Sequence, residues 1–131
     1  MERLIDLPKI PDKRGNLTFL ENQKQFPFTV SRVFWTYDVP GGEMRGGHAF
    51  HLQQEVIIAL SGSFDVVVKD KSGDVRRYHL NRSYKALYLP ALTWRHMENF
   101  STNSLSLHLS SHPFSETDYI RDYELFCSLE Q

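Results

Sequence analysis

The sequence has a single cysteine, no long apolar run and almost no net charge, and each shortage excludes a class of protein. With only Cys127, the chain cannot form an internal disulfide, which suits a reducing compartment. No apolar stretch approaches the roughly 20 residues that span a bilayer, and the first residues, MERLIDLPKIPDKRG, lack the apolar core of a signal peptide. We therefore expect a cytoplasmic protein with no membrane partner.

The charge balance argues against a nucleic-acid partner. The formal net charge is −1, from 15 Lys and Arg against 16 Asp and Glu, so the chain has no overall attraction for polyanions. At 131 residues it has the length of one domain, and no repeat, linker or low-complexity segment divides it. We expect one domain over residues 1–131.

What the sequence does contain is a series of short apolar stretches separated by turn residues. These stretches are rich in β-branched and aromatic residues, and aromatics make up 13% of the chain. Ser61-Gly62 and the segment 70–73 are typical of hairpin turns. The predicted strands are 31–38, 55–60, 63–69, 75–80, 86–89, 93–99 and 105–110. Short antiparallel strands in such a series predict an all-β sandwich or barrel.

The two ends of the chain differ from this pattern. Residues 1–24 hold one short strand candidate and few local partners, so we expect an arm that packs on the barrel or on a second subunit. Residues 115–129 begin with a capping-box-like Ser115 and Asp118, and Tyr119, Tyr123 and Phe126 follow at helical spacing. We expect a C-terminal helix over 115–129.

Two stretches match the spacing of the cupin metal motifs. Gly42, His48, Glu55 and Gly62 fall on the landmarks of the first motif, while Phe50 stands at its second histidine position. In the second motif Pro90 and Asn99 are in register, but Tyr84, Leu92 and Arg95 replace the two glycines and the histidine. The chain thus resembles the small cupins, which implies a jelly-roll barrel with a short C-terminal helix.

The exchanged ligands change the chemistry of the site. A cupin metal needs three imidazoles and a carboxylate, whereas this pattern keeps only His48 and Glu55 and adds the guanidinium of Arg95. Arginine stays protonated, so it repels a cation and attracts an anion. We therefore expect neither a metal nor another cofactor.

From about residue 14 to residue 126 the chain also resembles the sugar nucleotide 3,4-ketoisomerases, the WxcM-like family of metal-free cupins. The segments that carry this resemblance are RVFWTYDVPGGEMRGGHA, IIALSGSFDVVV, LNRSYKALYLPALTWR and DYIRDYELF. The resemblance implies a homodimer with N-terminal strand exchange. It also implies that the substrate is a dTDP-4-keto-6-deoxyhexose, on the way to a deoxy or amino sugar of a surface glycan.

Departures from the family pattern lie at the site itself. Arg45 and His48 match the family motif Arg-Gly-x-His-Ala-His, but Phe50 replaces its second histidine. Glu55 stands where the family usually has Gln, and His112 and Phe114 stand where Glu and Tyr are common.

Moving the ketone from C4 to C3 requires a base near neutrality and stabilisation of an enediol. We predict His48 as the catalytic base, with the Tyr37 hydroxyl assisting the enediolate. Arg45, Arg95 and Glu55 are predicted to bind substrate. His51 is a further substrate-binding candidate if a bulge resets the register, because strict strand alternation from His48 would turn it outward.

Phe50 leaves a second function open. A cupin without the second imidazole could bind a sugar nucleotide or a protein partner without catalysis. A metal-dependent cupin isomerase or oxygenase is a third interpretation, which the missing ligands disfavour.

Overall fold

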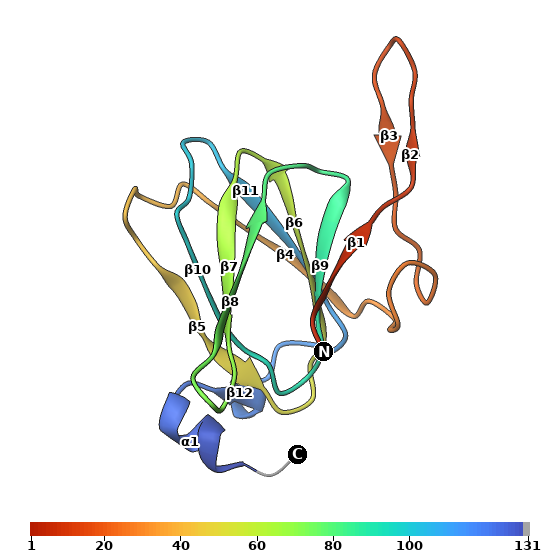
Figure 1. Cartoon of the computed structure of the whole chain (residues 1–131). Helices are drawn as coiled ribbons and strands as arrows, with labels where there is room; N and C mark the ends of the chain where they lie inside the picture. Colours follow the sequence, from red (N-terminus) through yellow and green to blue (C-terminus); the bar gives the residue numbers. More distant parts are fainter. Residues whose placement is uncertain (130–131) are drawn as a thin grey trace.

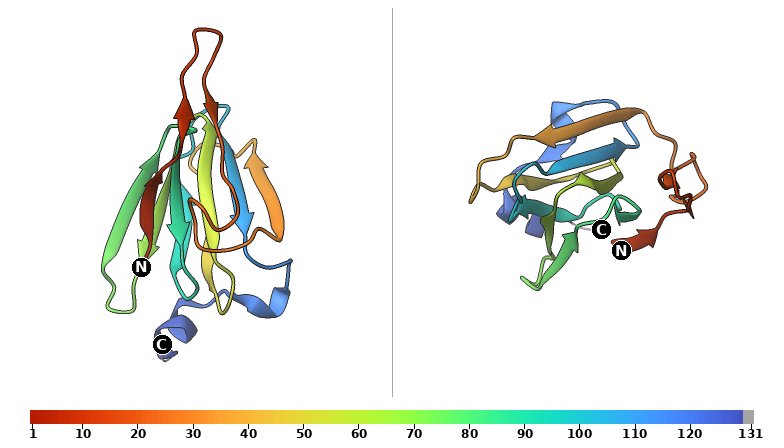
Figure 2. Two further views of the ribbon diagram at one scale, coloured as in Figure 1. Left: turned by 90° about the vertical axis from the view of Figure 1, so that its right-hand side faces the viewer. Right: turned by 90° about the horizontal axis from the view of Figure 1, so that it is seen from above.

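Two five-stranded antiparallel sheets face each other across an apolar interior (Figure 1), in a computed structural model that describes residues 1–129. The first sheet has the order β1 (Arg3–Asp6), β9 (Lys85–Leu89), β6 (Glu55–Ser61), β11 (Leu105–Ser110) and β4 (Arg32–Tyr37). The second has the order β12 (Tyr119–Ile120), β5 (Arg45–Phe50), β10 (Trp94–Glu98), β7 (Phe64–Lys69) and β8 (Val75–Leu80). Viewed from above, the sheets form two layers (Figure 2), as the predicted jelly-roll barrel requires.

The central strand β6 of the first sheet is buried on both of its faces over most of its length. Its run EVIIAL is apolar almost throughout, which is typical of a strand covered on both sides. Ile57 contributes to the cluster between the sheets, whereas Val56 and Ile58 pack on the opposite face. There Phe26 and Phe28, which follow the arm, belong to the same buried cluster. Strand β6 is therefore held in place by packing on both of its faces.

The N-terminal arm begins with a strand of the first sheet and continues into a hairpin. Strand β1 adds to the first sheet beside β9, with Leu4 opposite Leu87. The hairpin of β2 (Lys9–Ile10) and β3 (Leu17–Thr18) then projects beyond the barrel (Figure 1). The pairing of β1 with the chain's own β9 places the start of the arm on the barrel.

The C-terminal segment is less helical than predicted. Residues Glu116–Asp118 form a 3₁₀ turn, Tyr119–Ile120 form β12, and only Tyr123–Ser128 form the helix α1. Ser115 makes no side-chain cap, whereas Asp122 accepts a hydrogen bond from the Glu124 backbone N–H. The prediction of a helix from 115 was wrong because Tyr119 pairs with Phe50 as a strand residue.

The turn after β6 requires a glycine at position 62. Its φ is +66°, and a Cβ there would lie 2.8 Å from the Cα of Ser104 and 2.5 Å from the Ser101 Oγ. Only glycine fits both the left-handed backbone and the close approach.

Within residues 1–129, we find no helix of the length and apolarity needed to cross a lipid bilayer.

Candidate active site

A cavity of about 240 Å³ lies between the sheets, on the side where the edge strand β4 faces β5 and β12. Its lining combines imidazoles, guanidiniums and one carboxylate with aromatic and apolar side chains. The lining residues are Phe34, Thr36, Arg45, Gly46, His48, Phe50, Glu55, Ile57, Arg95, Met97, His108, Tyr119 and Arg121. A concave site of this kind, with a few converging polar groups, is where a small ligand binds by preference.

His48 points into the cavity from β5. Its ring contacts the edge of Phe50, with the ring centroids 4.7 Å apart, and lies 5.1 Å from Tyr119. Burial, followed by the positive charge of Arg95, lowers the pKa of His48 to about 3. The imidazole is therefore neutral near neutral pH, which is the form that can accept a proton.

Arg95 enters from β10 and is almost fully buried at 2% exposure. Its Nη2 donates to Glu55 Oε1 at 3.0 Å and its Nη1 donates to the Thr93 carbonyl at 2.8 Å. Its Nε is buried with no hydrogen-bond partner within residues 1–129. An unsatisfied buried donor of this kind costs about 1–3 kcal/mol.

Glu55 joins Arg95 to a second imidazole. Its Oε2 lies 3.1 Å from His108 Nδ1, and both side chains are at most 5% exposed. Burial alone would raise the pKa of Glu55, but His108 and Arg95 outweigh it and lower the pKa to about 2. The carboxylate is therefore ionised and accepts hydrogen bonds from both neighbours.

Two further arginines lie at the edge of the cavity and are exposed. Arg121 donates to Glu116 at 3.0 Å and its guanidinium lies over the Tyr119 ring. Arg45 makes no ion pair with any residue in 1–129. The rim thus offers positive charge beside a cavity whose interior holds His48.

Of the predicted site residues, His48, Arg45, Arg95 and Glu55 come together, but Tyr37 does not. Strand β4 alternates, so that Phe34 and Thr36 line the cavity while Tyr37 is 62% exposed on the other face. The prediction that the Tyr37 hydroxyl assists the enediolate was wrong, because the strand turns it to the outside of the sheet.

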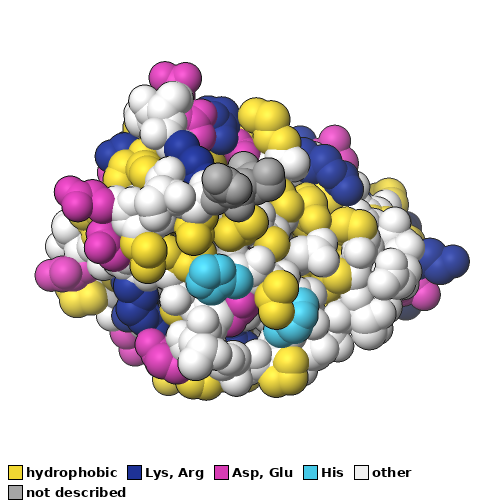
Figure 3. Space-filling view, turned by 90° about the horizontal axis from the view of Figure 1, so that it is seen from below, with side chains coloured by type: hydrophobic (Ala, Val, Ile, Leu, Met, Phe, Trp, Pro, Cys, Tyr) yellow, Lys and Arg dark blue, Asp and Glu magenta, His cyan; other side chains and the backbone are white. Residues whose placement is uncertain are grey.

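His51 is also outside the cavity. Strand β5 ends at Phe50 with regular alternation of His48 and Phe50 inward, and His51 follows it as an exposed residue. Its backbone N–H donates to the Asp118 carbonyl at 3.0 Å, at the α1 end of the molecule, where histidine and hydrophobic side chains share the surface (Figure 3). The register shift between β5 and β10 falls between Arg45 and His48, before this position, and does not turn His51 inward, so its assignment to substrate binding was wrong.

The sequence interpretation missed His108, Tyr119 and Arg121. Tyr119 and Arg121 had been placed in a helix, which hid their position beside Phe50. His108 is not among the site residues that the sequence predicts. The signal that could have found it is the strict alternation of LSLHLS, in which Ser106, His108 and Ser110 share one buried face of β11.

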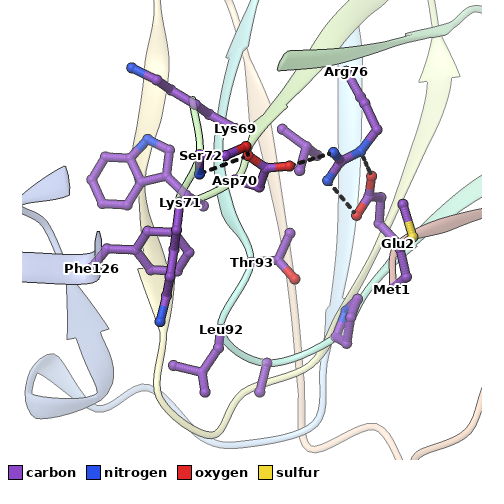
Figure 4. Close-up of a pocket in the computed structure, with 14 residues that line it drawn as sticks. Met1, Glu2, Lys69, Asp70, Lys71, Ser72, Arg76, Leu92, Thr93 and Phe126 are labelled. Atoms are coloured by element: carbon purple, nitrogen blue, oxygen red, sulfur yellow. Dashed lines mark hydrogen bonds and ion pairs between the residues drawn. The ribbon is translucent and has the colours of Figure 1, made fainter. Parts of the chain in front are cut away.

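A larger hollow of about 750 Å³ lies beneath the β7–β8 turn, between the N-terminus and α1 (Figure 4). Its cations are already engaged. Arg76 pairs with Glu2 and Asp70, Lys69 lies 4.1 Å from the centroid of the Tyr123 ring, and Lys71 bonds the Leu129 carbonyl. No imidazole lines it, so we place the candidate active site in the smaller cavity.

Over residues 1–129, the His, Cys, Asp and Glu side chains form no group of three that could hold a metal ion. Glu55, the carboxylate among the described lining residues of the cavity, is bonded to Arg95 and His108.

Comparisons with known proteins agree on one family. The family described as FdtA: WxcM-like, C-terminal matches residues 1–131. The chain is 35% identical over 124 residues to the TDP-4-oxo-6-deoxy-alpha-D-glucose-3,4-oxoisomerase of Aneurinibacillus thermoaerophilus, covering 95% of this chain and 88% of that protein.

Two solved structures are closely similar. The sugar 3,4-ketoisomerase QdtA from Thermoanaerobacterium thermosaccharolyticum, in complex with TDP, has a TM-score of 0.93 at 33% identity, covering 96% of this chain and 91% of that one. The WlaRB TDP-quinovose 3,4-ketoisomerase from Campylobacter jejuni has a TM-score of 0.91 at 36% identity, covering 96% of each chain.

Proposed function

The chain belongs to the FdtA, or WxcM-like, family, and from this premise we propose that it is a sugar nucleotide 3,4-ketoisomerase acting on a TDP-linked 4-keto-6-deoxyhexose. Its reaction moves the ketone from C4 to C3 of the sugar, and the product serves deoxy or amino sugar synthesis for surface glycans. The relatives that support this assignment carry the same reaction in their names.

The observation that carries the proposal is the pairing of a neutral His48 with Arg95 in one cavity. His48 is the base that removes the C3 proton, because its imidazole is unprotonated and faces the lumen. The guanidinium of Arg95, which lines the same cavity, supplies a fixed positive charge near the oxygen on which negative charge develops. Such a fixed charge needs no reorganisation as the enediolate forms.

The nucleotide end of the substrate lies at the rim. The cavity is smaller than the roughly 300–1,000 Å³ of typical small-molecule sites, so it accommodates the sugar ring and leaves the diphosphate outside. Arg45 and Arg121 supply positive charge there without a metal ion. We include in this proposal that the reaction is metal-independent. We also propose that it takes place in the cytoplasm, which the single cysteine supports.

Solvent exchange tests the reaction directly. The protein is incubated with TDP-4-keto-6-deoxyglucose in deuterium oxide, and NMR follows the sugar protons. We expect deuterium at C3 of the substrate and formation of the 3-keto product. Tight TDP binding with neither exchange nor product would contradict the proposal.

A His48→Asn variant tests the role of the base. We expect exchange at C3 to fall by about 10²–10⁴-fold, the usual contribution of a general base, while TDP affinity stays within a few-fold. His51→Asn is the matched control, because that exposed histidine lies outside the cavity. If His51→Asn lost exchange at C3 and His48→Asn kept it, His51 and not His48 would be the base.

Phe50 supports a second candidate function, binding without catalysis. Its ring is 1% exposed, lies against His48 and carries the Arg95 guanidinium 4.9 Å above it. A phenyl ring there packs well but transfers no proton. The exchange experiment separates the two functions, because a silent binder would retain TDP and leave the sugar protons unchanged.

We further propose that the protein acts as a homodimer through the N-terminal hairpin and the outer face of β4. Strand β4 is an edge strand, and its Val33, Trp35 and Tyr37 are all exposed. Ile10 and Leu17 are exposed on the projecting hairpin. Exposed apolar edges of this kind are usually covered by a partner.

Light scattering on the purified protein tests the dimer. We expect twice the chain mass of 15.3 kDa for the native protein and a shift to monomer for Trp35→Glu. Leu125→Glu, at an equally exposed position on α1, is expected to stay dimeric. A monomeric native protein at micromolar concentration would contradict the proposal.

A further inference from the structure

Phe114 lies in the loop between β11 and the 3₁₀ turn, and it is 59% exposed. Single exposed apolar residues are common on protein surfaces, so exposure alone assigns it no role. Its contacts distinguish it. The ring centroid lies 5.8 Å from that of Tyr119, which lines the candidate active site, and 5.4 Å from the guanidinium carbon of Arg32. An exposed aromatic ring is thus held directly beside the cavity.

Arg32 connects this ring to the cavity wall. It shares the face of β4 that carries Phe34 and Thr36 into the cavity. Its guanidinium carbon lies 4.6 Å from the centroid of the Phe34 ring. Phe34 in turn stacks on His108, with ring centroids 4.5 Å apart and planes 7° apart. These four planar groups form one series of contacts, which begins in the cavity and ends at the exposed ring of Phe114.

The charge of Arg32 is not matched by an acidic side chain. It makes no ion pair with any residue in 1–129, and its Nε is buried without a hydrogen-bond partner there. Arginine packs flat on aromatic faces, and here it contacts the rings of Phe34 and Phe114. The guanidinium therefore holds the Phe114 ring in place from the protein side.

A second row of contacts leads from the predicted base to the same ring. The His48 and Tyr119 rings lie 5.1 Å apart, and Tyr119 and Phe114 follow at 5.8 Å. Arg121 lies over the Tyr119 ring, 4.2 Å from its centroid. A sugar nucleotide carries its hexose and its base on opposite sides of a diphosphate. With the hexose at His48 and the diphosphate at Arg121, the base reaches the Phe114 side of the rim.

We propose that the ring of Phe114 stacks on the base of the bound nucleotide and forms the nucleobase subsite of this protein. The inference rests on the sugar nucleotide function proposed above, and it names the part of the site that holds the nucleoside. Every base has a planar π face, and stacking on an exposed ring removes apolar surface of both partners from water. Arg32 is the positioning residue of this subsite, because it acts through Phe114.

Other aromatic side chains fit this role less well. Trp35 and Tyr37 are 57% and 62% exposed, but they lie on the outer face of β4, away from the cavity. Trp94 packs against Phe126 and lines the larger hollow. Among the aromatic side chains of residues 1–129 that are more than half exposed, Phe114 is the one whose ring contacts a ring of the cavity lining.

Calorimetry with TDP and with inorganic pyrophosphate separates the base from the phosphates. For Phe114→Ala we expect TDP affinity to fall roughly 5- to 150-fold, the usual effect of removing one stacked ring, and pyrophosphate affinity to stay within about twofold. Phe114→Tyr should keep TDP affinity within about threefold, because the ring remains. Leu125→Ala is the matched control, since Leu125 is 51% exposed on α1 and does not line the cavity. Thermal unfolding verifies that each variant is folded.

NMR detects the stacking itself. Protons that lie over the face of an aromatic ring move upfield, so the thymine methyl and H6 signals of TDP should shift upfield on binding to the native protein. We expect the shift to persist in Phe114→Tyr and to be absent in Phe114→Ala at saturating TDP. A shift of the same size in Phe114→Ala would place the base elsewhere and would overturn the proposal.

Arg32→Met tests the positioning role, because it removes the charge and the flat guanidinium while keeping an apolar side chain of moderate length. We expect weaker TDP binding with pyrophosphate affinity unchanged. In a protein that already carries Phe114→Ala, Arg32→Met should change TDP affinity by less than about twofold, because two residues that act as one unit are not additive. Full additivity, or an equal loss of pyrophosphate affinity, would show that Arg32 binds the ligand directly and would overturn this role.

Three further results would overturn the nucleobase subsite. One is native TDP affinity in Phe114→Ala, and another is an equal loss of TDP and pyrophosphate affinity in that variant. The third is a change from dimer to monomer in Phe114→Ala by light scattering, which would assign the ring to a subunit contact. A native protein that binds no TDP would instead refute the proposed sugar nucleotide function, and the subsite with it.

Discussion

Arg95 and Glu55 form an ion pair inside the barrel, with Nη2 and Oε1 3.0 Å apart and the two side chains 2% and 4% exposed. Removal of one partner leaves the other charge buried without compensation, which usually costs about 3–5 kcal/mol. We therefore expect Glu55→Gln to lower the free energy of unfolding by an amount in that range, measured by urea denaturation. The exposed Glu116–Arg121 pair supplies the control, because Glu116→Gln should cost under about 1 kcal/mol. Equal losses in both variants would contradict the burial argument.

Acid should destabilise the fold through His48. Burial and the neighbouring Arg95 lower its pKa from 6.5 to about 3, so below pH 6.5 the unfolded chain binds a proton that the folded chain does not. The contribution of His48 to stability is thus complete above pH 6.5 and is lost as the pH falls toward 3. Arg121 and His108 add to this shift, and Glu55 opposes it.

Comparison with His48→Gln isolates this effect. We expect the native protein to lose unfolding free energy more steeply than the variant between pH 6.5 and 4.5, the interval above the usual pKa of Glu55. Parallel curves for the two proteins would show that His48 titrates normally in the folded state.

Tyr37 should be dispensable for the reaction. Its side chain is exposed on the outer face of β4, away from the cavity, and surface substitutions usually change free energies by about 0.5 kcal/mol or less. We expect Tyr37→Phe to keep kcat within about threefold of native in a product-formation assay. A loss of two orders of magnitude would restore this hydroxyl to the mechanism.

Gly62→Ala should destabilise the fold more than Gly73→Ala. Both glycines have positive φ, so an added methyl group is strained at each, at about 1 kcal/mol. At Gly73 nothing lies within 4 Å of the new Cβ, whereas at Gly62 the Cβ would meet the Ser104 backbone at 2.8 Å. Urea midpoints measure the difference, and equal shifts would contradict the steric explanation.

Much of the barrel follows from local patterns. Strands β6, β7, β8 and β11 were predicted within about a residue, because their alternation and their turns are local properties. Strand β5 was absent from the predicted strands, since its RGGHAF contains two adjacent glycines and offers no apolar alternation. Its strand conformation comes from pairing with β10, in which Arg95 lies opposite His48.

Strand β4 was also predicted, but the sequence does not say which of its faces points into the barrel. Aromatic and apolar residues occupy both faces, with Trp35 on one and Phe34 on the other. The structure turns Phe34 inward because β4 pairs with β11 in a register that sets it beside His108. The prediction of Tyr37 as a site residue depended on which face of β4 points inward, and the sequence of the strand does not specify this.

By itself, the sequence determined the barrel class, the exchanged motif around His48 and the positive charge at Arg95, because each depends on spacing along the chain. Only the tertiary structure decided which polar groups meet. Glu55 and His108 are 53 residues apart, and Arg95 and Glu55 are 40 apart, yet all three converge in one cavity. Pairing between strands that are distant in the sequence sets such contacts, and the local pattern of one strand does not specify which strand it pairs with.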